Sequence, residues 1–142
     1  MIDHKDFMHG AALVAIADSE MFTALNRASV KYGHYVVNHD RHLFIKYNEG
    51  KGPGDYFFTF SGEDKERITS ASASLVFAVL VCGNEVVTGL TRDELSQLIT
   101  LTIGAASTVK VSAQQGRQLR ISGPNGQLPL ISRRSFPTRI LE

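Results

Sequence analysis

The chain has 142 residues, a formal net charge of +1 and a single cysteine. That length accommodates one domain with one hydrophobic core, and a lone cysteine excludes a small fold held together by internal disulfides. No apolar run approaches the roughly 20 residues that span a bilayer, and the charged start does not resemble a signal peptide, so we expect a cytoplasmic protein with no membrane partner.

The near-neutral total charge conceals two regions of opposite sign. Residues 1–106 carry nine Lys and Arg against thirteen Asp and Glu, a balance of −4. Residues 107–142 carry six Lys and Arg against Glu142 alone, a balance of +5. A basic segment on an acidic body indicates either an anionic partner or a surface that docks on acidic groups of its own or another subunit.

The first 27 residues predict two helices. Phe7, Ala11 and Val14 recur at the spacing of one helical face, so we expect a helix over 7–17 whose apolar stripe packs on the core. Residues 21–27 fit either a second short helix or an edge strand, and the pattern favours the helix.

Residues 34–60 predict a three-stranded antiparallel meander. From His34 to Tyr47 the hydrophobic period changes to two, with a polar turn around Asp40, which is typical of a β-hairpin. The glycine-rich segment 48–55 predicts an exposed loop, and the aromatic run 56–60 predicts the third strand.

The most apolar stretch of the chain predicts a central hairpin. Residues 75–82 are all apolar and precede Gly83 and Asn84, which favours a strand buried on both faces and then a turn. The turn returns residues 85–88 as an antiparallel partner strand.

Two capping motifs predict the helices that flank this hairpin. Ser61 with Asp64 three residues later predicts a helix over 62–73. Thr91 with Glu94 predicts a second helix, which Gly104 ends.

The last third of the chain predicts strands again. A three-residue loop that ends with Gly116 in the left-handed conformation pairs Val111 with Leu119, and places Lys110 directly opposite Arg120. A turn over 123–126, a strand over 128–131 and an irregular tail around Pro137 complete the chain. Together these elements predict a single α+β domain over residues 1–142, in which an antiparallel sheet of meander and hairpins packs with three or four helices.

Three patterns suggest chemistry that their surroundings do not support. The five histidines include His39 and His42 in one hairpin, where an odd spacing points their side chains apart, so we expect a polar turn and no metal. Cys82 lies in the core strand, where a thiol is unreactive. The glycines of segment 49–54 lack the order of a phosphate-binding loop and the helix that should follow it.

One pattern resembles a nuclease signature. Pro53, Gly54 and Asp55, followed by residues 63–65 (Glu, Asp, Lys), are similar to the PD…(D/E)xK motif of restriction-endonuclease-like proteins. The resemblance implies Mg²⁺ held by Asp55 and Glu63, with Lys65 stabilising charge on the phosphate. A different pair, Asp40 and Lys46, lacks a metal ligand two residues before the lysine, because that residue is Phe44.

Most of the chain also resembles a group of small bacterial proteins of unassigned function. The segments that carry this resemblance are HGAAL, NRAS with YGHYVVN, FIKY, YFFTF and FAVLVCGNE. They are mainly strand cores, so the resemblance implies a self-contained bacterial domain and no particular chemistry.

We therefore predict a non-catalytic binding module for an anionic or macromolecular partner, with nucleic acid preferred. No catalytic residue, metal or cofactor is expected. The residues expected to bind are Lys110, Arg117, Arg120, Arg133 and Arg134. The alternatives are a degenerate Mg²⁺-dependent nuclease that uses Asp55, Glu63 and Lys65, and an adaptor subunit that acts through protein contacts.

Overall fold

The central element of the molecule is a five-stranded sheet. Its strands are β1 (Leu25–Ser29), β2 (His34–Val37), β3 (Arg41–Asn48), β5 (Leu75–Cys82) and β6 (Val86–Thr91). In the computed structural model, which describes residues 4–29, 32–50, 52, 54–71, 75–102, 104–114 and 116–142, they lie in the order β1-β2-β3-β5-β6. Neighbouring strands are antiparallel except β3 and β5, which are parallel.

A second, antiparallel sheet packs across the first. Its strands are β4 (Asp55–Phe60), β7 (Ser107–Ser112), β8 (Arg120–Gly123) and β9 (Gly126–Gln127), in the order β4-β7-β8-β9. The described residues also form four helices, α1 (His4–Ala17), α2 (Gly62–Ser70), α3 (Arg92–Leu98) and α4 (Thr138–Leu141).

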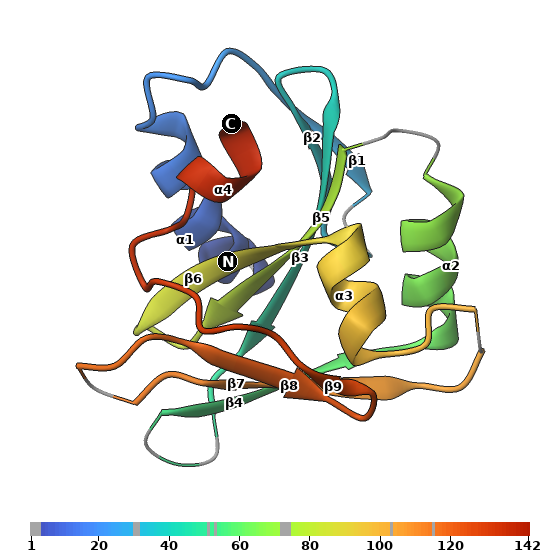
Figure 1. Cartoon of the computed structure of the whole chain (residues 1–142). Helices are drawn as coiled ribbons and strands as arrows, with labels where there is room; N and C mark the ends of the chain where they lie inside the picture. Colours follow the sequence, from blue (N-terminus) through green and yellow to red (C-terminus); the bar gives the residue numbers. More distant parts are fainter. Residues whose placement is uncertain are drawn as a thin grey trace.

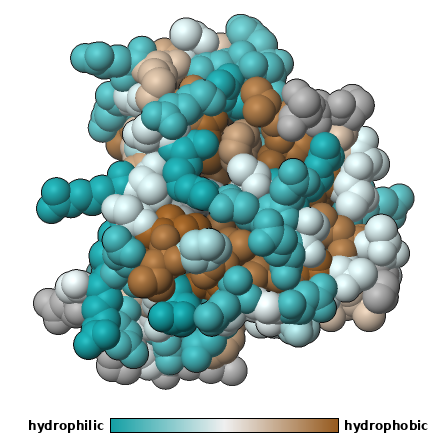
Figure 2. All heavy atoms as spheres, viewed as in Figure 1, coloured by the Kyte–Doolittle hydropathy of each residue, from teal (hydrophilic) through white to brown (hydrophobic). Residues whose placement is uncertain are grey.

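The five-stranded sheet is covered on both faces. Helices α1 and α4 pack on one face, where Ala12, Ile16 and Ile140 meet Leu43 and Val79 in one buried cluster. Helices α2 and α3 and the second sheet cover the other face and form a larger cluster (Figure 1). In the same view, hydrophobic atoms show between the layers while hydrophilic side chains cover most of the rest (Figure 2). The result is a single compact α+β domain, as the sequence predicts.

The hairpins and capping motifs are confirmed. Strands β2 and β3 pair around a three-residue turn, in which Asn38 and His39 have positive φ, and β5 pairs with β6 as expected. Both predicted capping boxes are present, at Ser61 for α2 and at Thr91 for α3. The first capping box forms although Asp64 replaces the usual Glu, because its carboxylate still reaches the Ser61 N–H at 2.9 Å.

The predicted meander is wrong at its third strand. β4 forms over the expected residues, but it pairs with β7 in the second sheet and not with β3. β3 instead pairs in parallel with β5, so the main sheet is mixed and not antiparallel. Parallel neighbours need a connection of a dozen residues or more. The segment 49–74, which contains β4 and α2, supplies it.

Two predictions for the N-terminal region are also wrong. Residues 21–27 do not form a helix, because β1 begins at Leu25 and adds an edge strand to β2. Helix α1 forms, but Phe7 and Val14 are 62% and 60% exposed, and His9, Ala12 and Ile16 form its buried face. His9 occupies a core position because its ring bonds the hydroxyl of Tyr35 at 3.0 Å, so the hydrophobic pattern alone selects the wrong face.

The β7–β8 register differs from the predicted one by two residues. Val111 lies opposite Ile121 and not Leu119, which instead bridges to Ile131. Lys110 therefore faces Ser122, while Arg120 faces Ser112. Because side chains alternate with a period of two, this even shift leaves every residue on its predicted face. Gly116 has the predicted left-handed φ, +76°.

The elements near the C-terminus are shorter or more regular than predicted. α3 ends at Leu98, well before Gly104, and Ile103, within the predicted helix, lies outside the described residues. The expected strand over 128–131 is replaced by β9 and a single bridge at Ile131. The tail forms α4, because its buried Ile140 and Leu141 pack on the sheet.

Candidate functional site

The outer face of the four-stranded sheet carries exposed side chains. Along β7 the side chains alternate, with Val109 and Val111 buried in the core and Thr108 and Lys110 exposed. No helix of the described residues lies over this face (Figure 1). Its side chains are therefore not selected by packing, and they remain accessible to a partner.

Lys110 and Arg120 lie on this face beside an exposed aromatic ring. Phe57 on β4 is the direct neighbour of Lys110, whose Nζ lies 5.9 Å from the centre of the ring. Phe57 is 37% exposed, whereas Tyr56, Phe58 and Phe60 on the same strand are buried. The face therefore offers two cations and a flat apolar surface together.

A groove beside this face continues the positive charge. We call it the basic groove, a cavity of about 460 Å³ lined by Ser112, Gln114, Arg117, Gln118, Arg120 and Leu130. A second hollow of about 260 Å³ shares Arg117 and Gln118 with it and adds Arg134. Within the described part of the chain, no acidic side chain pairs with Lys110, Arg117, Arg120 or Arg134.

The fifth predicted cation, Arg133, has a structural role. Its guanidinium donates to the carbonyl oxygens of Ala113, Gln114 and Arg117 at 3.1 to 3.4 Å, and to the Glu85 carboxylate at 3.3 Å. Arg133 thus ties the C-terminal segment to the loop that follows β7. Four of the five predicted residues remain available to an anion.

The structure does not bring the nuclease-like residues together. Asp55 begins β4, and Glu63 and Lys65 follow its far end, about 17 Å away at the usual rise per residue of a strand. Lys65 is buried and donates to the Ala105 carbonyl at 2.6 Å. The Glu63 carboxylate accepts a hydrogen bond from the Tyr32 hydroxyl.

The second nuclease-like pair is also divided. Asp40 pairs with its neighbour Arg41. Lys46 pairs with Asp64 at 2.7 Å. Each charge is therefore engaged in a different contact.

Four of the five histidines, His4, His9, His34 and His42, contact another side chain. The described residues contain no group of three or more His, Cys, Asp or Glu that could hold a metal ion. His34 and His42 lie 2.9 Å apart, N to N, and His34 stacks on Phe44. Burial first, and then the charges of His42 and Arg67, lower the pKa of His34 to about 4. Sequence reasoning missed this pair, although the hairpin register alone places both rings on one face.

Cys82 and the glycine-rich loop offer no reactive group. Burial raises the pKa of the Cys82 thiol to about 12, although nearby Arg133 partly opposes this effect, so the thiolate is scarce at neutral pH. The loop leads directly into β4 and not into a helix, and its Lys51 and Pro53 lie outside the described residues.

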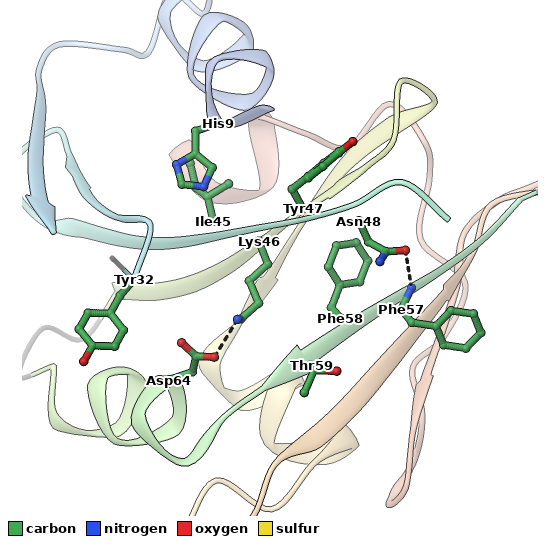
Figure 3. A pocket seen from close by; sticks show the side chains of 10 residues that line it. All are labelled: His9, Tyr32, Ile45, Lys46, Tyr47, Asn48, Phe57, Phe58, Thr59 and Asp64. Atoms are coloured by element: carbon green, nitrogen blue, oxygen red, sulfur yellow. Dashed lines mark hydrogen bonds and ion pairs between the residues drawn. The ribbon is translucent and has the colours of Figure 1, made fainter. Parts of the chain in front are cut away.

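A cleft that sequence reasoning missed lies where β3 and β4 separate into different sheets (Figure 3). It has a volume of about 380 Å³ and is lined by residues 45–48 and 57–59, with His9, Tyr32 and Asp64. Asn48 closes its narrow end, because its Oδ1 accepts hydrogen bonds from the N–H groups of Gly50 and Phe57.

The wide end of this cleft carries the Lys46–Asp64 ion pair. Lys46 crosses from β3 toward α2 (Figure 3). Burial would raise the pKa of Asp64, but hydrogen bonds from Lys46 and the Ser61 backbone lower it overall. The carboxylate is therefore ionised at neutral pH. The feature of the sequence that could have indicated the cleft is the aromatic run 56–60, because only alternate residues of this run enter the core.

Comparisons with protein-family models, curated proteins and solved structures find no match to this chain. The resemblances noted from the sequence therefore stay predictions. Among the described helices, none has the length and apolar character needed to cross a membrane.

Proposed function

We propose that the chain is a non-catalytic binding module that takes a single-stranded nucleic acid on the outer face of its four-stranded sheet. One observation carries this proposal. Four exposed cations without an acidic partner among the described residues gather on this uncovered face and its adjoining grooves, beside the exposed ring of Phe57.

The chemistry of the face suits a single strand better than a duplex. Lys110, Arg117 and Arg120 provide positive charge for successive phosphates, and Phe57 provides a ring on which a base stacks. Reading a duplex in its major groove requires a protruding helix or ribbon, whereas this face is a flat sheet. We expect binding that depends on charge and stacking and discriminates weakly among base sequences.

The test is a fluorescence-anisotropy titration of the whole chain with labelled single-stranded DNA and RNA at several salt concentrations. The logarithm of the association constant should fall linearly with the logarithm of salt concentration. Replacing both Arg117→Gln and Arg120→Gln should weaken binding and reduce the slope by about 1.4, at about 0.7 per lost single-strand phosphate contact.

Arg27→Gln is the matched control, because Arg27 is an exposed arginine on β1, in the other sheet. Arg27 pairs with exposed Asp6 and donates to the Tyr35 hydroxyl at 3.3 Å, so replacing it leaves the contacts of the outer face intact. If this single-charge control weakens binding half as much, in free energy, as the double variant, net charge alone drives binding. No binding to either nucleic acid would contradict the proposal and favour a protein partner, and metal-dependent cleavage would favour the nuclease.

A further inference from the structure

We propose that the cleft between β3 and β4 is a second binding site, and that its ligand is a nucleobase held by the open backbone edge of β4. The inference does not depend on the proposed function. Its recognition groups lie on the edge of β4, whereas the cations and the Phe57 ring lie on the outer face of the sheet.

The open edge follows from one hydrogen bond. Among the described strands, β4 lies at the edge of its sheet and pairs with β7, and Asp55 at its start also bridges to Gly52. The Phe57 N–H donates to Asn48 Oδ1 at 3.1 Å, so Phe57 directs its backbone groups away from β7. In an antiparallel ladder, residues two apart direct their N–H and C=O groups to the same side. The Phe57 C=O and the Thr59 N–H therefore both face the cleft, and no described residue pairs with them there.

This pair of groups matches the hydrogen-bonding edge of a base. An acceptor and a donor follow each other along the strand, and each nucleobase presents a neighbouring donor and acceptor on its Watson–Crick edge. An open strand edge also suits an added peptide strand. Here the cleft is bounded by Asn48 at its narrow end and by the Lys46–Asp64 pair at its wide end, and its volume of about 380 Å³ favours a small planar ligand over an extended chain.

The remaining walls complete a nucleoside site. Phe58 lies between β3 and β4, and the Tyr32 ring lies at the wide end, while the Tyr47 ring extends from β3 away from β4 (Figure 3). At the wide end, Asp64 Oδ2 accepts from Lys46 at 2.7 Å and from the Ser61 N–H at 2.9 Å. Asp64 Oδ1 has no hydrogen bond to a described residue, so it remains able to accept one from a sugar hydroxyl.

The first experiment is a ¹⁵N–¹H NMR titration of the full chain with adenosine, with a mixed-sequence oligonucleotide and with ribose 5-phosphate. We expect a saturable downfield shift of the Thr59 amide, because that N–H acquires an acceptor. A shift with adenosine assigns the site to free nucleosides, and a shift with the oligonucleotide only assigns it to a base of a bound strand. No shift from either overturns the proposal, as does the same shift produced by ribose 5-phosphate, which has no base.

The second experiment removes the donor alone. Thr59→Pro deletes an N–H that points out of the sheet, a position where an edge strand accepts proline. Thr59→Ala is the matched control, because it loses the hydroxyl, which lies 3.0 Å from that of Thr108, but keeps the N–H. We expect binding to weaken at least about tenfold in the proline variant and to stay within about twofold in the alanine variant. Equal affinity of the two folded variants overturns the proposal, and the amide titration of the natural chain decides the question if the proline variant does not fold.

The two proposals fail separately. The Arg117→Gln, Arg120→Gln variant should lose the salt-dependent binding of the strand and keep the adenosine-induced shift of Thr59. Loss of both would mean that the cleft has no binding capacity of its own, and would overturn this inference.

Discussion

The two sheets of this molecule differ in how far packing determines the residue type at each position. In β5 of the five-stranded sheet, seven consecutive residues are buried, because helices cover one face and the second sheet and two helices cover the other. In β7 of the four-stranded sheet, buried and exposed residues alternate, because only one face is covered. Packing therefore selects almost every residue of β5 but only alternate residues of β7. The exposed half of the second sheet is where cations without partners collect.

The largest expected effect comes from the doubly covered sheet. Leu80 on β5 is fully buried, so Leu80→Ala should lower the free energy of unfolding by about 2–5 kcal/mol through lost burial and a cavity. Thr108→Ala, on the outer face of β7, should change it by less than about 0.5 kcal/mol. Urea denaturation of both variants measures the contrast. Similar losses would show that the outer face is covered in solution, for example by a second copy.

The sequence predicts local structure well where one short-range rule decides it. Both capping boxes, the two hairpins of the first sheet and the alternation of β7 follow from neighbours along the chain. The partner strands of β3 and β4 cannot be predicted from neighbours along the chain, because pairing two strands across a connection of more than twenty residues depends on the whole fold.

The residues of the candidate sites were likewise predictable only where local sequence features decide them. The four available cations were predictable from the charge asymmetry of the chain. The structural role of Arg133 was not, since it depends on three carbonyl oxygens of the loop after β7. The cleft arises only because β3 and β4 join different sheets, so local reasoning that placed them in one meander could not find it.

The Glu94–Arg139 pair tests how the two covering layers of the first sheet are joined. It links α3 on one face to α4 on the other, with a contact of 2.6 Å. Glu94→Gln removes this charge pair and weakens the capping box at Thr91, so we expect a loss of about 1–3 kcal/mol. Glu66→Gln, an exposed change on α2, is the control and should cost less than about 0.5 kcal/mol.

The same pair predicts a dependence on acid. Burial alone would raise the pKa of Glu94, but hydrogen bonds from Arg139 and the Thr91 backbone lower it overall below its ordinary value of 4.5. The folded state therefore binds this proton less readily than the unfolded state, and the stabilisation present above pH 4.5 is lost as the pH falls through the lower, folded pKa. Urea denaturation at neutral and acidic pH should show that acid lowers the free energy of unfolding less in Glu94→Gln than in the natural chain. If acid lowers it equally in both chains, Glu94 is not the source of the acid dependence.

A second pH effect should come from His34, at the side of the first sheet that faces α2. Its pKa of about 4 lies below the ordinary 6.5, so the folded state favours the neutral ring. Stability contributed by this ring is complete above pH 6.5 and declines as the pH falls toward 4. We expect His34→Gln to reduce the decline in unfolding free energy over this range, measured by urea denaturation. A parallel decline in both chains would assign the effect to other groups.

The smallest effect on stability, and the sharpest contrast between the sheets, should come from replacing Lys110 and Arg120 together by Gln. The two side chains face Ser122 and Ser112 and not each other, so removing both relieves little repulsion. Both are exposed and neither has an acidic partner among the described residues, so the free energy of unfolding should change by less than about 0.5 kcal/mol. Single-strand binding should nevertheless weaken, with a salt slope reduced by about 1.4 for two lost phosphate contacts. A loss of stability above about 1 kcal/mol with unchanged binding would instead mean that these cations dock on carboxylates of this chain or of another subunit, and that the outer face is an assembly surface.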